Sequence, residues 1–244
     1  MGKKGAAAVV IGNEVLTAKV VEQNGAYLVQ RLRQRGVALR SMTFVPDEVD
    51  PIVEAVSLAR SRVRWVFTSG GIGPTHDDVT VRAVALALGR RVTRLPGMEQ
   101  LIKDHYGPAL PPAALRLADA PEGTELLTQA GTWYPVLACE GVFMLPGVPE
   151  LFRSQLEAAL ARVEGAALHQ RALYLSEGEA EVAAVLDRIA LSMPDVSIGS
   201  YPTFDRTLGF KVKLTVEAGE AAAVERAVKR LTAELPAGSI LRSE

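Results

Sequence analysis

The sequence contains one glycine-rich segment that ends in acidic residues, Thr68-Ser69-Gly70-Gly71-Ile72-Gly73-Pro74-Thr75-His76-Asp77-Asp78. It follows an apolar run that predicts a β-strand, and ligands of open α/β sheets bind at the carboxyl ends of the strands. Glycines in such a turn let backbone N–H groups approach a phosphate without obstruction by a Cβ atom. The hydroxyl groups of Thr68, Ser69 and Thr75 could donate further hydrogen bonds, and the following helix would add its positive N-terminal end. We therefore predict that this segment holds a phosphorylated ligand.

Two better-known phosphate-binding motifs do not fit this segment. A P-loop requires a lysine directly after its last glycine, and no lysine follows Gly73. A dinucleotide fingerprint requires a further glycine three residues after Gly73, where the sequence has His76. The structural alternative is a tight turn from strand to helix in which the side chain of Asp77 or Asp78 caps the helix. The residues alone leave both interpretations open.

Acidic residues also follow the two earlier predicted strands. Glu14 comes after the apolar run 6–11, and Asp47 comes after the run 37–45. Because the carboxyl ends of parallel strands meet at one edge of a sheet, we expect Glu14, Asp47 and Asp78 to lie together. The paired carboxylates of Asp47 and Asp78 could hold Mg²⁺ or another hard divalent cation that bridges phosphate oxygens. The alternatives are a helix cap for Asp47 and a solvated loop charge for Glu14.

The elements that would position these residues follow from the pattern of apolar runs. Short apolar runs alternate with helical patterns through the first 165 residues, which indicates parallel βαβ units and an α/β fold with a mostly parallel sheet flanked by helices. The predicted strands are residues 6–11, 37–45, 64–68, 124–128, 136–139 and 142–145. The predicted helices are one through Val20, Tyr27 and Leu32 that Gly36 ends, then 49–61, 78–89, a proline-punctuated stretch 96–120, and 150–164. The turn Leu145-Pro146-Gly147-Val148-Pro149 could serve only as a turn or contact a ligand.

A domain boundary is expected at Gly165-Ala166-Ala167, which gives domains 1–165 and 166–244. Beyond the boundary the order changes to strand, helix, strand, strand and helix, at residues 171–175, 179–190, 196–201, 210–217 and 221–235. This order predicts a small α+β domain.

Composition limits the classes of partner. The 244 residues include 27 basic and 28 acidic side chains, so a general nucleic-acid binder is not expected. The single cysteine, Cys139, excludes a disulfide framework within the chain and a cysteine-based zinc site. No segment approaches the roughly 18 apolar residues that a membrane span needs. We expect a cytoplasmic protein with no membrane partner.

Taken together, the motifs resemble the molybdopterin-binding (MoaB/Mog-type) fold, in the branch of CinA and the N-terminal domain of FAD synthases. The segment from Ser69 to Thr80 is similar to the family's Thr-Gly-Gly-x-Gly-Pro-x-x-x-Asp-Val-Thr, with Asp78 at the functional aspartate. Pro46-Asp47-Glu48 resembles the Pro-Asp-Glu that carries the second aspartate. Gly12-x-Glu14 and Leu145-Pro146-Gly147-Val148-Pro149 resemble the opening and closing motifs. Residues 199–202 and 211–215 look like the KH-like extension of this branch.

The resemblance implies a metal-dependent nucleotide pyrophosphatase that acts on ADP-ribose or FAD. It implies a divalent metal of the Mg²⁺ or Co²⁺ class, with K⁺ as a further ion, and assembly into a dimer or trimer. Asp47, Asp78 and Glu14 would be catalytic, and Asp47 and Asp78 would bind the metal. The ligand-binding set would be Gly12, Asn24, Thr68, Ser69, Gly70, Gly71, Gly73, Pro74, Thr75, Asp77, Pro146 and Gly147.

Departures from the family pattern leave two further functions open. Ala18 stands where this branch usually has glycine, and the Gly-Thr-Ala-Pro-Gly of CinA proteins is lost near residues 131–135. One alternative is a protein that binds or adenylylates molybdopterin, as in the Mog-type branch. The other is a nucleotide-binding module without catalytic activity.

Overall fold

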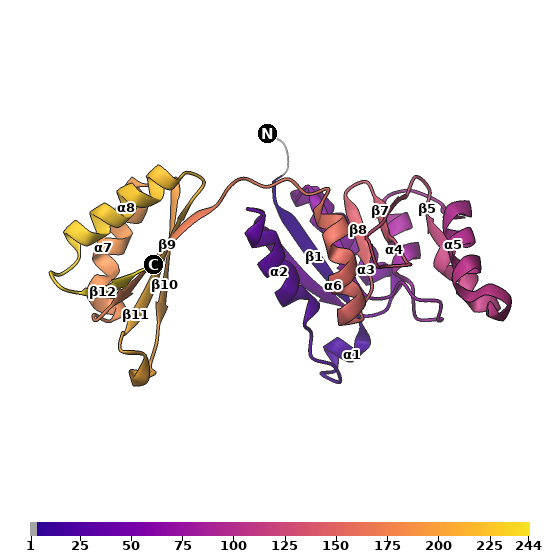
Figure 1. Cartoon of the computed structure of the whole chain (residues 1–244), viewed down its shortest axis with the longest axis horizontal. Helices are drawn as coiled ribbons and strands as arrows, with labels where there is room; N and C mark the ends of the chain where they lie inside the picture. Colours follow the sequence, from indigo (N-terminus) through magenta and orange to yellow (C-terminus); the bar gives the residue numbers. More distant parts are fainter. Residues whose placement is uncertain (1–3) are drawn as a thin grey trace. The chain divides into compact units, whose positions relative to one another are not determined.

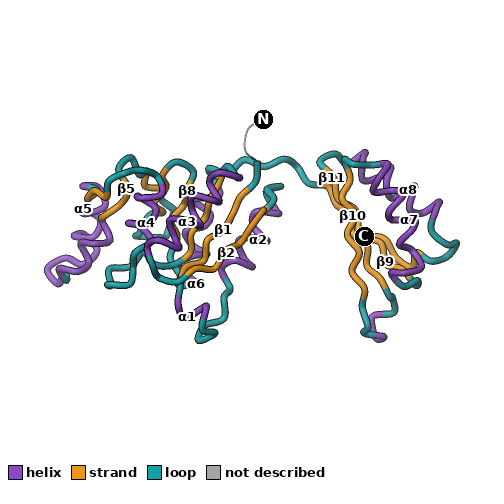
Figure 2. The backbone as a smooth tube through the Cα atoms, turned by 180° about the vertical axis from the view of Figure 1, so that it is seen from behind, coloured by secondary structure: helices purple, strands orange, loops and turns teal. Residues whose placement is uncertain are grey.

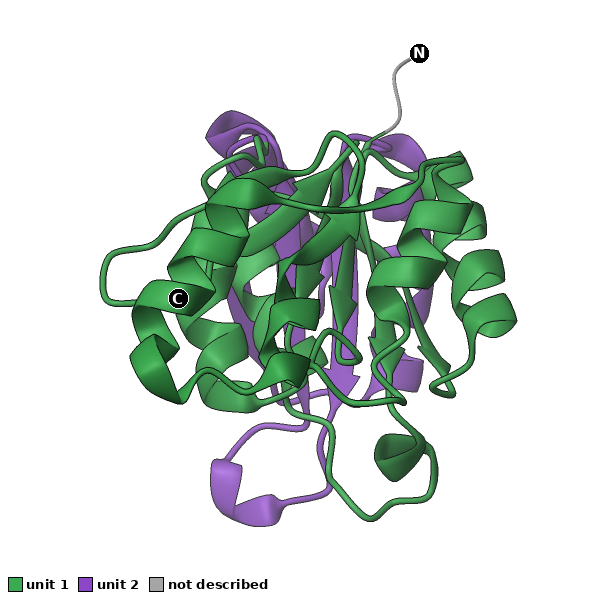
Figure 3. Cartoon of the chain, turned by 90° about the vertical axis from the view of Figure 1, so that its right-hand side faces the viewer, with its two compact units in different colours: residues 1–165 green, residues 166–244 purple. Residues whose placement is uncertain are grey.

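The computed structural model describes residues 4–244, so that residues 1–3 of the predicted first domain lie outside the described chain. The chain divides into two compact units, of which unit 1 extends to Gly165 and unit 2 comprises Ala166–Glu244 (Figure 3). Figure 1 shows the elements of each unit in sequence order.

Unit 1 is built on a six-stranded sheet in the order β2-β1-β3-β8-β7-β6. Its strands are β1 (Ala6–Ile11), β2 (Leu39–Val45), β3 (Trp65–Ser69), β6 (Glu125–Leu127), β7 (Val136–Cys139) and β8 (Val142–Leu145). The first four strands of this order run parallel to one another, whereas β7 pairs antiparallel with both β8 and β6. The predicted α/β fold with a mostly parallel sheet is therefore confirmed.

Helices cover both faces of this sheet (Figures 1 and 2). Strand β1 is buried along its whole length, as expected for a central strand between two helical layers. Its residues Ala7, Val9 and Ile11 pack with side chains of α3 (Val49–Arg62) and α4 (Thr80–Ala87). The alternate residues Ala6 and Ala8 pack in a second cluster with α2 (Asn24–Gln34) and α6 (Pro149–Leu160).

The predicted helix through Val20 is wrong in its first part. A short helix α1 (Asn13–Leu16) follows β1, and α2 begins only at Asn24. Between them Ala18 has a left-handed φ of 56°, which no residue of a right-handed helix can adopt. Glycine enters the left-handed region at little cost, so this conformation would suit the glycine that the family resemblance implies at this position.

The predicted helical stretch 96–120 is broken at Gly107-Pro108 and at Pro111-Pro112, where its prolines predicted breaks. It contains α5 (Pro96–Tyr106), and two 3₁₀ helices, η1 (Gly107–Ala109) and η2 (Pro112–Ala118), follow. The stretch ends as a strand, because β5 (Asp119–Pro121) pairs antiparallel with β4 (Val92–Arg94). Met98, Ile102, Ala114 and Ala118 form a small core of their own beneath α5 and η2. Neither β4 nor β5 was predicted from the sequence.

Unit 2 is an α+β unit with a four-stranded antiparallel sheet in the order β10-β11-β9-β12. The helices pack their apolar side chains on one face of the sheet, where they form a separate core. The last strand of unit 2, β12 (Ile240–Ser243), was not predicted, because it is short and largely exposed. The elements are β9 (His169–Leu175), α7 (Glu179–Ser192), β10 (Val196–Pro202), η3 (Arg206–Leu208), β11 (Val212–Ala218), α8 (Ala221–Glu234) and β12 (Ile240–Ser243).

None of the helices within residues 4–244 has the length and apolar character that crossing a membrane requires.

A core substitution in β3 tests the sheet of unit 1. Phe67 is 1% exposed, and its ring lies 5.0 Å from that of Phe143 on the neighbouring strand. Phe67→Ala should lower the free energy of unfolding by about 3–5 kcal/mol, because the cavity left behind cannot fully collapse. Trp65 and Trp133 are the two tryptophans of the chain, so tryptophan fluorescence during urea unfolding follows unit 1. The control Leu58→Ala, on the exposed side of α3, should cost less than about 0.5 kcal/mol, and equal losses would contradict the structure.

Candidate functional site

Four parallel strands of unit 1 end at the same edge of the sheet. Ile11 is the register partner of Val45, and Ser69 is the partner of both Val10 and Leu145. The segments that follow these strand ends are those with the glycine and acidic motifs. The chain passes from β1 to β2 on one side and then to β3 on the other, which makes this edge the topological switch point where α/β sheets bind ligands.

The turn after β3 requires glycine at two positions. Gly70 has a φ of 105° and Gly71 a φ of 66°, both in the region that other residues avoid. A Cβ atom on Gly70 would run into the carbonyl oxygen of Ile11, and one on Gly71 would run into the hydroxyl of Thr80. Thr80 fixes the turn, since its Oγ1 and its N donate hydrogen bonds of 2.9 Å to the carbonyls of Gly70 and Gly71.

One of the three predicted backbone donors is already used. The N–H of Gly70 donates to the carbonyl of Leu145 at 3.0 Å, so it links β3 to β8 and does not face a ligand. The N–H groups of Gly71 and Gly73 have no acceptor within residues 4–244, and both glycines line a pocket. The expected phosphate-binding amides are thus reduced to those of Gly71 and Gly73.

The carboxylates of the glycine-rich segment do not cap the following helix. Helix α4 begins at Thr80, and its N-cap residue is Val79, without a side-chain cap. Instead Asp78 Oδ2 accepts a hydrogen bond of 2.8 Å from the N–H of Thr75, and the Thr75 hydroxyl lies against both Asp78 and Asp77. The hydrogen bond from this hydroxyl, and then that from the Asp77 backbone, lower the pKa of the exposed Asp77 carboxyl. The capping alternative for Asp77 and Asp78 is therefore wrong.

Asp47, like Asp78, accepts a hydrogen bond from a backbone N–H group, and this bond links the ends of β1 and β2. Its Oδ2 accepts a hydrogen bond of 2.8 Å from the N–H of Asn13, which follows β1. The N-cap residue of α3 is Glu48, again without a side-chain cap, so the capping alternative for Asp47 is also wrong. Glu14 is exposed on the short helix α1, beside Asn13. Within the described chain, Oδ1 of Asp47 and Oδ1 of Asp78 accept no hydrogen bond.

Asn24 holds three segments together from inside the wall of the site. This side chain is 4% exposed at the start of α2. Its Nδ2 donates hydrogen bonds to Ser69 Oγ at 2.9 Å and to the carbonyl of Gly147 at 2.8 Å. Asn24 thereby connects α2 to the end of β3 and to the turn before α6. The Ser69 hydroxyl belongs to this internal network, which accounts for its burial.

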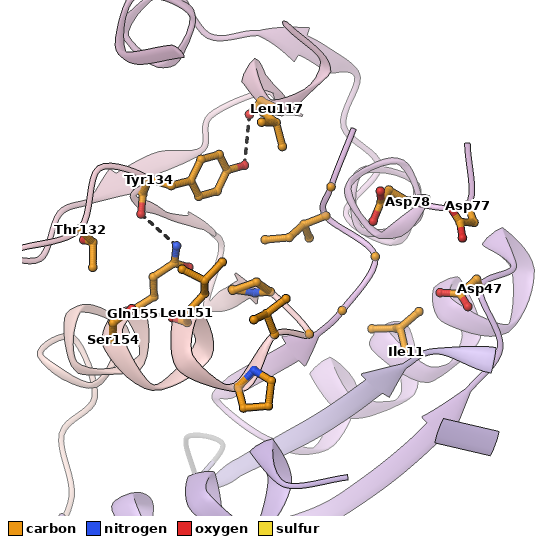
Figure 4. A pocket seen from close by; sticks show the side chains of 18 of the residues that line it. Ile11, Asp47, Asp77, Asp78, Leu117, Thr132, Tyr134, Leu151, Ser154 and Gln155 are labelled. Atoms are coloured by element: carbon orange, nitrogen blue, oxygen red, sulfur yellow. Dashed lines mark hydrogen bonds between the residues drawn. The ribbon is translucent and has the colours of Figure 1, made fainter. Parts of the chain in front are cut away.

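A pocket of about 680 Å³ lies at this edge of the sheet (Figure 4). The structure brings together many of the predicted site residues on its wall, namely Glu14, Asp47, Gly70, Gly71, Gly73, Asp77, Asp78, Pro146 and Gly147. The other predicted site residues do not line the pocket, namely Gly12, Asn24, Thr68, Ser69, Pro74 and Thr75. The hydroxyl of Thr68 is fully buried in the sheet and the hydroxyl of Thr75 binds the two aspartates, so neither faces a ligand in this arrangement.

Sequence reasoning missed most of a second wall, which is largely apolar. Of this wall, only Val148 and Pro149 lie in a segment for which a ligand contact was considered. Its residues come from η2, the loop 128–135 and the start of α6, and Figure 4 shows several of them across the pocket from Asp47, Asp77 and Asp78. They are Leu117, Gly131, Thr132, Trp133, Tyr134, Val148, Pro149, Leu151, Ser154 and Gln155. The sequence signal for this wall was the loss of the CinA pattern near residues 131–135, which marked the region as different without showing its place.

Two hydrogen bonds hold the loop of this second wall. The hydroxyl of Tyr134 donates to the carbonyl of Leu117 at 3.1 Å, and Gln155 Nε2 donates to the carbonyl of Tyr134 at 2.9 Å. Burial, and then the negative charge of Asp78, raise the pKa of Tyr134 well above its usual range. A raised pKa favours the protonated phenol, which is the form that donates to the carbonyl of Leu117.

The charges of the pocket are of one sign. Four carboxylates line it, those of Glu14, Asp47, Asp77 and Asp78, and no Lys, Arg or His within the described chain joins them. Nor do residues 4–244 place three or more His, Cys, Asp or Glu side chains so that they could hold a metal ion by themselves. Mg²⁺ is commonly bound by one or two carboxylates together with phosphate oxygens and water. The free Oδ1 atoms of Asp47 and Asp78 fit this mode, in which the ligand completes the site.

The chain is similar to known proteins over both units. Residues 7–165 match the family described as "Probable molybdopterin binding domain", and residues 167–244 match "FAD synthase, middle domain". A protein of Thermococcus kodakarensis is 32% identical over 238 residues, which cover 91% of this chain and 93% of that protein. A "Probable FAD synthase" of Caenorhabditis elegans is 30% identical over 267 residues, and the match covers 98% of this chain but only 51% of that protein.

One solved structure has a closely similar fold. CinA from Thermoplasma acidophilum, described as a protein with unknown function, is 32% identical in sequence and superposes with a TM-score of 0.60. The match covers 64% of this chain and 95% of that one. The dimer or trimer and the cytoplasmic location expected from the sequence stay predictions.

The network around Asn24 gives a test of the wall. Asn24→Ala should lower the free energy of unfolding by about 2 kcal/mol, because the buried Ser69 Oγ loses its donor and the link to the carbonyl of Gly147 is lost as well. Chemical unfolding followed by tryptophan fluorescence measures the loss. Gln30→Ala, at an exposed position of the same helix, is the matched control and should change stability by less than about 0.5 kcal/mol. A neutral Asn24→Ala would show that this link is dispensable.

The glycine turn gives a second test. Gly70→Ala should cost more than about 2 kcal/mol, because it adds a clash with the Ile11 carbonyl to the left-handed backbone penalty. Gly89, which has a φ of 64° and no atom within 4 Å of an added Cβ, is the matched control. Gly89→Ala should cost only the backbone penalty, about 1 kcal/mol. Thermal unfolding of the two variants would contradict the predicted geometry if Gly89→Ala proved the more damaging.

Proposed function

The chain belongs to the molybdopterin-binding domain family, as its motifs predicted, with an FAD synthase middle domain as its second unit, and on this premise we propose that it is a metal-dependent pyrophosphatase. Its substrates would be dinucleotides with a central diphosphate, such as ADP-ribose or FAD. The observation that carries the proposal is the division of one pocket into two unlike walls. One wall has glycine amides and carboxylates, and the other has aromatic and aliphatic side chains.

The two walls match the two chemical parts of a dinucleotide. The amides of Gly71 and Gly73 can donate to phosphate oxygens at the strand ends. Trp133, Tyr134 and Leu151 offer an apolar surface for a ring system across the same pocket. A volume of about 680 Å³ lies within the range of pockets that enclose small organic ligands.

The carboxylates of the pocket are the reason that the proposed activity would require a metal ion. A diphosphate beside Glu14, Asp47, Asp77 and Asp78 would be repelled, because no cationic side chain of the described chain lines the pocket. A divalent ion held by Asp47 and Asp78 would neutralise this repulsion and draw charge from the phosphate oxygens. Thr75 fixes the orientation of Asp78 for this role, and the N–H of Asn13 fixes that of Asp47.

The reaction is the hydrolysis of a phosphoanhydride. A water molecule forms a bond to one phosphorus while the bond from that phosphorus to the bridging oxygen breaks. The bridging oxygen leaves with the second phosphate, and the protons of the water pass to the products and to solvent. FAD would give AMP and FMN, and ADP-ribose would give AMP and ribose 5-phosphate. The amides of Gly71 and Gly73 would stabilise the developing charge, and the exposed Glu14 would orient the water.

A second candidate function uses the same pocket. The family that unit 1 matches is described by molybdopterin binding, and molybdopterin likewise joins a nitrogen heterocycle, the pterin, to a phosphate group on its side chain. In this case the chain would bind molybdopterin or transfer an adenylyl group to it from ATP. The two-walled pocket suits this ligand as well, so the products decide between the two functions.

Hydrolysis is tested directly with the purified chain. ADP-ribose or FAD is incubated with Mg²⁺, Mn²⁺ or Co²⁺, and AMP is measured by liquid chromatography. AMP should form only when metal is present, and Asp78→Asn should reduce turnover by about 100-fold or more, because an amide in place of this carboxylate holds the divalent metal more weakly and the metal stabilises the transition state. The matched control is Asp50→Asn, an exposed carboxylate on α3 outside the pocket, which should keep full turnover.

The other outcomes separate the alternatives. Absence of AMP with every metal and both substrates would overturn the pyrophosphatase. Tight nucleotide binding without turnover, unaffected by Asp78→Asn, would identify a non-catalytic module. Formation of an adenylylated pterin from ATP would establish the second candidate.

A further inference from the structure

Trp133 presents a flat aromatic surface at the pocket. It is 38% exposed, and it lines the pocket together with Tyr134. His105 of α5 stacks against it, with ring centroids 3.7 Å apart and planes 6° from parallel. An imidazole in this position covers one face of the indole and fixes its orientation.

The remaining rings stand beside this stack. Tyr106 is perpendicular to both partners and lies nearer to His105, at 5.0 Å, than to Trp133, at 6.2 Å. It therefore lies at the side of the stack and not on the free face of the indole. Tyr134 meets Trp133 at 74° with centroids 5.5 Å apart, and both residues line the pocket.

Gln155 places a polar atom next to these rings. The side chain is 2% exposed and lines the pocket. Its Nε2 donates to the carbonyl of Tyr134, the residue after Trp133, which fixes which end of the amide is oxygen. Oε1 is buried and has no hydrogen-bond partner within the described residues. A buried acceptor without a donor is unfavourable, so a ligand with an N–H group at this position would be stabilised by it.

We propose that Trp133 and Gln155 form a ring subsite for a flat nitrogen heterocycle, which stacks on Trp133 and donates an N–H group from its edge to Gln155 Oε1. The subsite selects phosphorylated ligands that carry such a ring, as adenine nucleotides do, over phosphates that lack one. This inference rests on the proposed function only in placing the phosphates of the same ligand at Gly71 and Gly73. His105 is a positioning residue that holds the indole ready for stacking.

The first test measures the preference for the ring. Calorimetry with Mg²⁺ gives the affinities for ADP and for inorganic pyrophosphate, which shares the diphosphate but lacks the ring. ADP should bind more tightly, and Trp133→Ala should reduce the ratio of the two affinities by about 5- to 150-fold, the usual worth of stacking a base on an aromatic side chain. Trp133→Phe, which keeps a ring, should retain most of the ratio. An unchanged ratio in Trp133→Ala would overturn the subsite.

The second test uses the fluorescence of Trp133 and leaves both residues of the subsite unchanged. In Trp65→Phe, Trp133 becomes the only tryptophan of the chain, so its fluorescence reports on its own surroundings. ADP with Mg²⁺ should quench this fluorescence and pyrophosphate should not. A diphosphate analogue of ADP without the exocyclic amino group should bind more weakly than ADP to the same variant, because it lacks the donor for Gln155 Oε1.

The outcomes distinguish this inference from the function on which it rests. Wild-type protein that binds pyrophosphate as tightly as ADP, with no quenching, would overturn the ring subsite and leave the phosphate site standing. Wild-type protein that binds neither probe would overturn the proposed function and the subsite with it.

Discussion

The site depends on the close approach of the backbone at Gly70 to the ends of three strands. Its N–H donates to Leu145 of β8, and its Cα lies so near the Ile11 carbonyl of β1 that a side chain has no room. The turn before α6 also reaches it, since a Cβ on Gly147 would lie 3.4 Å from the Gly70 Cα. Because one residue without a side chain joins β1, β3 and β8, the segments after these strands are brought to a common edge.

This packing determines which groups remain for a ligand. Polar side chains at the base of the turn, such as Asn24 and Ser69, are used to hold the segments together. Thr75 is used to orient Asp77 and Asp78. What faces the pocket is a set of backbone amides and carboxylates, without a cationic side chain from the described chain. A pocket lined by carboxylates can bind a phosphate only when a cation lies between them. The negative charge of the pocket is therefore the reason for proposing a metal ion.

Sequence reasoning reached one wall of the pocket and not the other, for a physical reason. Parallel strands bring their carboxyl ends together, so Glu14, Asp47 and Asp78 could be grouped from their positions after three apolar runs. Whether Asp47 and Asp78 cap helices depends on offsets of one or two residues, which only the folded backbone fixes. Gln155 meets the carbonyl of Tyr134, the residue after Trp133, through tertiary packing of a loop on α6, and no local pattern marks such a contact. The short strands β4, β5 and β12 have too few residues for a period to be seen.

The two walls also differ in how closely they follow the family pattern. The segment from Ser69 to Thr80 keeps the glycines and the aspartate of the family motif, and its geometry leaves little freedom, because Gly70 and Gly71 cannot accept a side chain. The loop 131–135 departs from the CinA pattern, and its glycine at position 131 has open space around it. A loop outside the sheet can exchange residues without disturbing the strand ends. In the proposed function, this division would let the wall that faces the ring of a ligand change while the strand ends keep their geometry, and Trp133 would be the residue of this chain on that wall.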